Sequence, residues 1–173
     1  EFVENKFYGL PFEVNEMICK EGVKDYMGSI TSIKPRDYQV DAVHDALRYN
    51  RKLLISPTAS GKSFMIYSVV RFHVGMNRKV LLVVPTTSLV VEQMFKDFQD
   101  YGWDAENHCH RIYAGRERVN TNEVTITTWQ SVYQMDRLFF EDYDVIIGDE
   151  AHLFKSKSLI GIMDKCHHAK YRY

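Results

Sequence analysis

The residues with the clearest chemical potential form the stretch Ser56-Pro57-Thr58-Ala59-Ser60-Gly61-Lys62-Ser63, which follows the apolar run Leu53-Leu54-Ile55 and precedes a helical pattern. The apolar run predicts a buried strand. If Gly61, Lys62 and Ser63 open the helix, their unpaired N–H groups and the positive end of its dipole face the loop. That environment suits a polyphosphate, with the Lys62 ammonium on the terminal phosphates and the Ser63 hydroxyl on Mg²⁺. We therefore expect a phosphate-binding loop contributed by Thr58, Ala59, Ser60, Gly61, Lys62 and Ser63.

The match to the general pattern G-x-x-x-x-G-K-[ST] is imperfect, because Ser56 occupies the first glycine position. Ala59 adds a Cβ that would resist a positive φ. An ordinary strand-to-helix turn rich in Ser and Gly is the alternative interpretation, so a second motif has to decide between them.

That second motif is Asp149-Glu150-Ala151-His152, directly after the apolar run 143–148. We expect this run to be a strand beside the one that feeds the phosphate loop, with Asp149 near the metal and Glu150 near an attacking water. Asp-Glu in isolation would be better explained as a solvated turn. Following a strand and downstream of a phosphate loop, it indicates an ATP site with Lys62 and Glu150 in catalytic roles.

Composition places limits on the class of protein. The chain has 173 residues, the size of one domain with room for an appendage, and 45% of them are hydrophobic. Lys and Arg number 22 against 23 Asp and Glu, so contacts with nucleic acid must be local rather than driven by bulk charge. No apolar stretch reaches membrane-spanning length and no signal-peptide pattern opens the chain. We expect a cytoplasmic protein without a membrane partner.

The cysteines favour a reducing compartment, because Cys19, Cys109 and Cys166 cannot pair completely and none lies in a C-x-x-C pattern. The tracts His108-Cys109-His110 and Cys166-His167-His168 invite a zinc hypothesis. Neither has the ligand spacing of a zinc finger, so the sequence argues against zinc.

The elements that must position these motifs alternate between strands and amphipathic helices. This alternation predicts an α/β fold with parallel strands, right-handed crossovers and helices on both faces of the sheet. Residues 1–34 are expected to be an appendage with a short helix over 14–26 and a linker over 28–32, and residues 35–173 the ATP-binding domain. Strands are expected at 53–55, 79–84, 109–113, 124–127 and 143–148, and helices at 35–49, 62–74, 87–101, 129–135 and 159–163.

Three further elements carry polar groups at fixed places between these strands and helices. Arg36-Asp37-Tyr38-Gln39 opens the first long helix, Val84-Pro85-Thr86-Thr87 follows one strand, and Thr127-Thr128-Trp129-Gln130 follows another. Hydroxyl and N–H groups at a helix start suit the phosphates of a nucleic-acid strand, although a simple helix cap explains the threonines equally well. An exposed helical Gln is the alternative for Gln39, and we expect Trp129 to pack in the core.

These elements, in this order, resemble the first RecA-like domain of superfamily 2 helicases over residues 35–173. Within that superfamily, RDYQ, VPTTSLVVEQ, TTWQS and DEAH look most similar to the recombination helicases of T-even bacteriophages, followed by XPB-like repair helicases. The resemblance implies a RecA-like P-loop NTPase fold and Mg²⁺ held by Ser63 and Asp149. It also implies that Gln39 reads adenine and that His152 couples ATP to nucleic acid. The nucleic-acid contacts it implies are Pro85, Thr86, Thr87, Thr128 and Gln130.

The same resemblance implies an ATP-dependent helicase of the DEAH type that unwinds or branch-migrates DNA in recombination, replication or repair. Its implied partners are single-stranded or branched DNA, RNA–DNA hybrids and a second RecA-like domain. The 173 residues have no room for that second domain, so we expect the chain to be a fragment with little turnover of its own. The remaining alternatives are a P-loop ATPase that moves protein and a lone nucleotide-binding module.

Overall fold

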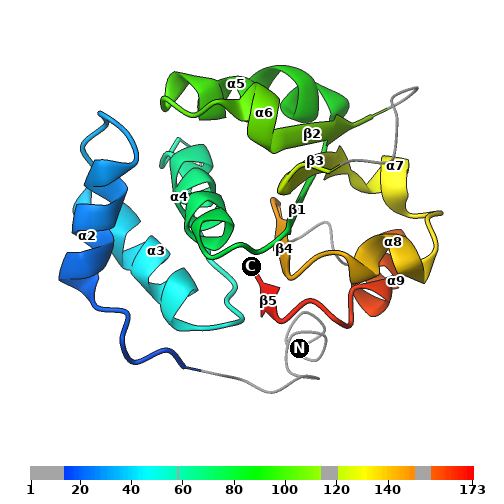
Figure 1. Ribbon diagram of the computed structural model, residues 1–173, viewed down its shortest axis with the longest axis horizontal. Coiled ribbons are helices and arrows are strands. Elements are labelled where there is room, and N and C mark those ends of the chain that lie inside the picture. The colour runs from blue at the N-terminus through cyan, green and yellow to red at the C-terminus, as the bar shows by residue number, and fades with distance from the viewer. Residues whose placement is uncertain (1–13, 58, 114–120, 151–156) are drawn as a thin grey trace.

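The computed structural model describes residues 14–57, 59–113, 121–150 and 157–173, and its centre is a five-stranded parallel sheet (Figure 1). The strand order is β2-β3-β1-β4-β5. β1 is in the middle and pairs with β3 from Val80↔Val124 to Val84↔Thr128. The strands span Val80–Val84 (β1), Cys109–Ile112 (β2), Val124–Thr128 (β3), Val145–Gly148 (β4) and Tyr171–Arg172 (β5).

Helices cover both faces of the sheet, as the sequence predicts (Figure 1). Side chains alternate along β1, so Val80, Leu82 and Val84 pack with α2, α3, α4 and α5, while Leu81 and Val83 pack with α7, α8 and α9. The helices span Lys20–Ser29 (α2), Asp37–Arg48 (α3), Lys62–Gly75 (α4), Met94–Asp100 (α5), Ala105–His108 (α6), Trp129–Val132 (α7), Arg137–Glu141 (α8) and Lys157–Lys165 (α9). A π-helical turn, η1 (Leu89–Gln93), leads into α5.

The expected strand over residues 53–55 is wrong. Leu53 and Ile55 are 43% and 94% exposed, and only Leu54 packs against the core. Backbone pairing stops just before this segment, where Lys52 N–H donates to Arg172 O (3.0 Å). Apolar composition alone could not reveal this, because a strand also needs a ladder partner.

The expected position of β4 directly beside this segment is also wrong. β5 lies next to β4, with Val145 opposite Tyr171, and Arg51 forms a parallel bridge with Arg172 on the other side of β5. β5 therefore stands between β4 and the segment that leads into the phosphate loop, so Asp149 and that loop do not follow neighbouring strands.

The N-terminal region also differs from its prediction. The helix α2 begins at Lys20 and runs through Gly22 to Ser29, so it takes in part of the expected linker. Val23 and Met27 of this helix are buried in the same core as α3 and α4. Cysteines 19, 109 and 166 are free, as expected. Within the described ranges, every helix is too short or too polar to cross a lipid bilayer.

A chain of hydrogen bonds joins α4, β5 and the end of α3 through His73. Arg78 donates to His73 Nδ1 (3.1 Å), and His73 Nε2–H then donates to the Tyr173 hydroxyl (3.2 Å). The Tyr173 hydroxyl in turn donates to the Tyr49 carbonyl oxygen (3.2 Å). Burial and, to a lesser extent, the Arg78 charge lower the pKa of His73 from 6.5 to about 3, so the imidazole is neutral in the folded protein.

This neutral histidine predicts a loss of stability at mildly acidic pH. Above about pH 6.5 the folded and unfolded states both hold neutral imidazole; as the pH falls towards 3, only the unfolded chain takes up the proton. We expect His73 to account for a loss of about 2 kcal/mol of unfolding free energy between pH 7 and pH 5. Denaturant titrations of the wild type and His73→Asn over this range measure it. Parallel pH profiles of the two proteins would contradict the prediction.

The loop before α4 contains a strained residue, because Ala59 adopts φ 61° in the left-handed region that favours glycine. We expect Ala59→Gly to stabilise the fold by about 1 kcal/mol as this strain is relieved. Ala42→Gly within helix α3 is the matched control and should instead destabilise by about 1 kcal/mol. Chemical denaturation compares the two, and equal losses in both variants would show that the Ala59 backbone carries no strain.

Candidate nucleotide and nucleic-acid site

The phosphate loop is shaped by Gly61, which precedes the first residue of α4 with φ 77°. A Cβ at Gly61 would come within 2.5 Å of Gln39 Nε2, so a larger residue would displace the Gln39 amide from the loop. Ser56 and Ser60 are joined through their hydroxyl groups, and Ser60 N–H donates to Pro57 O (3.3 Å), which closes the turn. Glycine is therefore required here by both conformation and space.

Helix α3 holds this loop through two hydrogen bonds to one carbonyl oxygen. The Tyr38 hydroxyl (2.8 Å) and Gln39 Nε2 (3.1 Å) both donate to Ser60 O. Gln39 Oε1 also accepts from Arg36 N–H (3.0 Å), and the side chain is 6% exposed. The amide keeps one N–H and one lone pair beyond these bonds, so contact with adenine stays a prediction. The sequence reasoning missed Tyr38, whose adjacency to Gln39 was the available signal.

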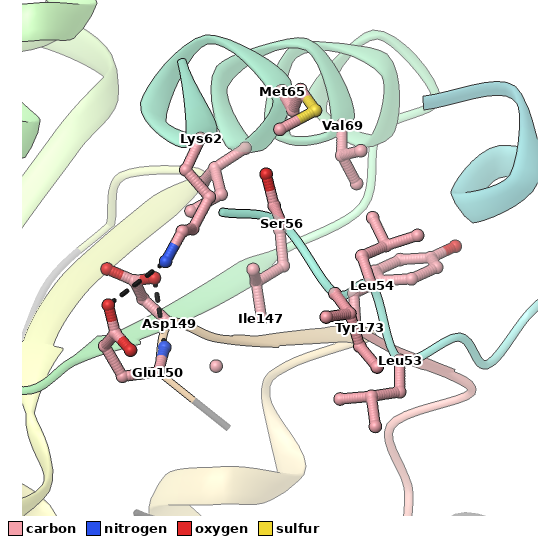
Figure 2. A pocket seen from close by; sticks show the side chains of 13 residues that line it. Leu53, Leu54, Ser56, Lys62, Met65, Val69, Ile147, Asp149, Glu150 and Tyr173 are labelled. Atoms are coloured by element: carbon pink, nitrogen blue, oxygen red, sulfur yellow. Dashed lines mark hydrogen bonds and ion pairs between the residues drawn. The ribbon is translucent and has the colours of Figure 1, made fainter. Parts of the chain in front are cut away.

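An ion pair connects α4 to the end of β4. Lys62 Nζ lies 3.1 Å from Glu150 Oε1, and each side chain is 37% exposed (Figure 2). Asp149 lies beside this pair in the same pocket. Burial raises the pKa of the Asp149 carboxyl above its ordinary value, and the Lys62 ammonium opposes that rise. The structure thus brings the two predicted motifs together although 88 residues separate Lys62 from Glu150.

The backbone at the end of β4 presents both carboxylates at the carboxyl edge of the sheet. Asp149 N–H donates to Val83 O (2.9 Å), so the chain stays paired with β1 for one residue beyond the strand. Glu150 has φ 58°, and its N–H donates to Asp149 Oδ1 (3.0 Å). A non-glycine residue in the left-handed region stores strain of the kind that gathers at functional sites.

Ser63, the other predicted metal ligand, lies one residue after Lys62 in the first turn of α4. Its hydroxyl is 2.8 Å from the Tyr101 hydroxyl at the end of α5. Ser63 also hydrogen-bonds the Asp97 carboxyl, so its single O–H donates there, the Tyr101 hydroxyl donates to Ser63, and one Ser63 lone pair stays available to a cation. Hydroxyl and carboxylate oxygens are the donors that Mg²⁺ prefers, so Ser63 and Asp149 fit such an ion. No sequence pattern pointed to Tyr101.

A pocket of about 350 Å³ lies beside Lys62, Asp149 and Glu150. Lys62, Asp149 and Glu150 lie at one end of it, and the remainder is mostly apolar (Figure 2). That remainder is lined by Leu53, Leu54, Ile55, Ser56, Met65, Ile66, Val69, Ile147, Gly148 and Tyr173.

The residues predicted to contact nucleic acid lie at the carboxyl edge of two neighbouring strands. Val84 is paired with Thr128, so Pro85–Thr87 and Thr128–Gln130 both leave the sheet at this edge. Thr86, Thr87 and Gln130 are exposed and Pro85 is half-buried. Thr128 is only 3% exposed and its hydroxyl is 3.0 Å from that of Ser131, so its own side chain faces the protein. Trp129 packs, as expected, against the core between the sheet and helices α7, α8 and α9.

Two of the predicted site residues, Thr58 and His152, lie outside the residues that the structure describes. Their roles in phosphate binding and in coupling remain expectations from the sequence. The other predicted members of the ATP site lie in the phosphate loop, in the first turn of α4, at the end of β4 and at the start of α3.

Comparison with known proteins agrees with this geometry. Residues 32–172 match the model of the family described as "Type III restriction enzyme, res subunit". The chain is 31% identical over 146 residues to the ATP-dependent DNA helicase uvsW of Enterobacteria phage T4, covering 82% of this chain and 29% of that protein. It is 27% identical over 157 residues to the DNA 3'-5' translocase XPB2 of Sulfurisphaera tokodaii, covering 91% and 30%.

A solved structure of the UvsW helicase from bacteriophage T4 superposes with a TM-score of 0.83 at 28% identity, covering 92% of this chain and 60% of that one. The chain spans about three-tenths of the length of the two curated relatives it matches. From the family match, the shared fold and the convergence of the two ATP motifs, we conclude that this chain belongs to the Type III restriction enzyme res-subunit family of superfamily 2 helicases and forms a RecA-like helicase domain.

Proposed function

We propose that this chain is the ATP-binding half of a DNA helicase motor. The observation that carries the proposal is the Lys62–Glu150 ion pair, which joins the phosphate loop to the end of β4 with Asp149 beside it. In the proposed sequence of events, the nucleotide phosphates take over the Lys62 ammonium. Glu150 is then freed to orient and deprotonate the attacking water.

Ser63 and Asp149 would hold Mg²⁺, which supplies charge stabilisation for the phosphates when bound. Asp149 suits this role because a half-buried carboxylate with a raised pKa gains from a nearby cation. Gln39 and Tyr38 would keep the loop in its binding shape, with the remaining amide groups of Gln39 available to adenine.

The proposed substrate is single-stranded or branched DNA, with RNA–DNA hybrids as a further class. The motor would act on it in recombination or repair within the cytoplasm. Support comes from relatives named as a DNA helicase and a DNA translocase, and from the exposed Thr86, Thr87 and Gln130 at one edge of the sheet. A second RecA-like domain would complete the motor, with His152 coupling the ATP site to nucleic acid.

The first test concerns nucleotide binding. Lys62→Ala removes the cation from the phosphate loop, and Ala is a good helix former, so the fold should persist. We expect the affinity for Mg-ATP to fall about ten- to hundred-fold, the loss of a hydrogen bond to a charged group. Lys52→Ala is the matched control, because Lys52 is similarly exposed (35%) and pairs with Asp45 at 3.2 Å. Calorimetric titration measures both, and equal affinities for the two variants would refute the site.

The second test concerns the nucleic-acid edge. Gln130→Ala should weaken binding of a single-stranded oligonucleotide about two- to ten-fold, as expected for one polar contact, and binding should weaken further as salt is raised. Gln99→Ala, at an exposed position on α5, is the control and should bind like the wild type. Fluorescence anisotropy at two salt concentrations provides the measurement. A larger loss in the Gln99 variant would place the DNA on another surface.

A further inference from the structure

A second, polar hollow of about 510 Å³ lies at the opposite edge of the sheet from the phosphate loop. Two of its lining residues, Arg78 and Lys170, come just before β1 and β5, whereas the ATP motifs follow the carboxyl ends of the strands. The end of α3 contributes Arg48, and Asn15 and Asn50 add amide groups. Neither the ATP site nor the proposed DNA edge includes any of these residues.

Positive charge dominates the lining. Arg48, Arg78 and Lys170 contribute three cations, while Glu16 is the one carboxylate among the lining residues. Arg48 Nε is buried and has no hydrogen-bond partner in the described structure. Arg48 as a whole is half-buried and lines the hollow, so its terminal guanidinium nitrogens rather than the enclosed Nε would meet an anion there.

Arg78 is held in place without being neutralised. Its guanidinium donates to His73 Nδ1 (3.1 Å) and lies 4.2 Å from the centroid of the Tyr171 ring. Because His73 Nε2–H donates a hydrogen bond to the Tyr173 hydroxyl, the neutral imidazole presents Nδ1 as the acceptor for Arg78. Among the residues that the structure describes, the partners of Arg78 are thus uncharged or aromatic, and its positive charge stays available to a ligand.

We propose that this hollow binds a phosphate group, held by the Arg48 and Arg78 guanidinium groups with Lys170 at its rim. Guanidinium groups bind phosphate through paired hydrogen bonds, and two of them with an ammonium match its charge. The group comes from free phosphate or from the backbone of a nucleic-acid strand. The site is separate from the ATP site and does not depend on the proposed helicase function.

The test uses Lys62→Ala protein, in which binding at the phosphate loop is weakened, and compares further variants within that background. Calorimetric titration with inorganic phosphate and pyrophosphate should show saturable binding. Adding Arg48→Gln should weaken it at least about tenfold, the value of one charged hydrogen bond. Lys170→Gln provides a second variant at an exposed position in case the Arg48 variant is unstable. Arg137→Gln, exposed on α8, is the control and should bind like its parent.

A short oligothymidylate distinguishes the two sources. If the oligonucleotide competes with pyrophosphate and its binding is lost in Arg48→Gln, the ligand is a nucleic-acid backbone. If only phosphate and pyrophosphate bind, the ligand is a free anion. Absence of saturable binding up to about 20 mM phosphate, well above a dissociation constant of about 1 mM for a weak specific site, would overturn the proposal. Binding equally strong in the Arg48, Lys170 and Arg137 variants would overturn it as well.

Discussion

The carbonyl oxygen of Ser60 accepts hydrogen bonds from Tyr38 and Gln39, and this pair of bonds fixes the phosphate loop against α3. The arrangement requires glycine at position 61, because a Cβ there would meet the Gln39 amide. With the loop fixed, α4 begins at Lys62 and directs its ammonium to Glu150 at the end of β4. The parallel sheet then determines where the other groups lie, since β1, β3 and β4 all end at the same edge.

Much of this fold follows from the sequence. The strands at 80–84 and 145–148 are continuous apolar runs because helices cover both of their faces, and α3 and α4 begin near their predicted residues. Leu53–Ile55 has the same apolar composition but lies beyond the pairing of Arg51 with Arg172. Composition indicates the environment that a residue prefers and not which strand pairs beside it. The lack of a ladder partner at Leu53–Ile55 and the position of β5 in the sheet could therefore not be predicted.

The candidate site was likewise predictable only in part. Motif spacing was enough to predict that Lys62, Asp149 and Glu150 lie together, because each motif follows a regular element whose end the pattern predicts. Contacts made by isolated side chains were not predictable. Tyr101 reaches Ser63 from α5, and α5 itself follows the Pro85–Thr87 segment through the π-helical turn η1. This contact links a proposed metal ligand to the far end of the helix that follows the proposed DNA edge, and only the packing of α5 on α4 reveals it.

The central claim is that the first turn of α4 and the end of β4 together form the ATP site. Backbone amide resonances of this 20.3 kDa protein test it most directly when Mg-ATP is titrated in. The account predicts that the largest shifts fall on Ser60, Gly61, Lys62 and Ser63, with a second group at Asp149 and Glu150, because these N–H groups and side chains would surround the phosphates and metal. Shifts confined to other elements, or none at saturating nucleotide, would contradict it.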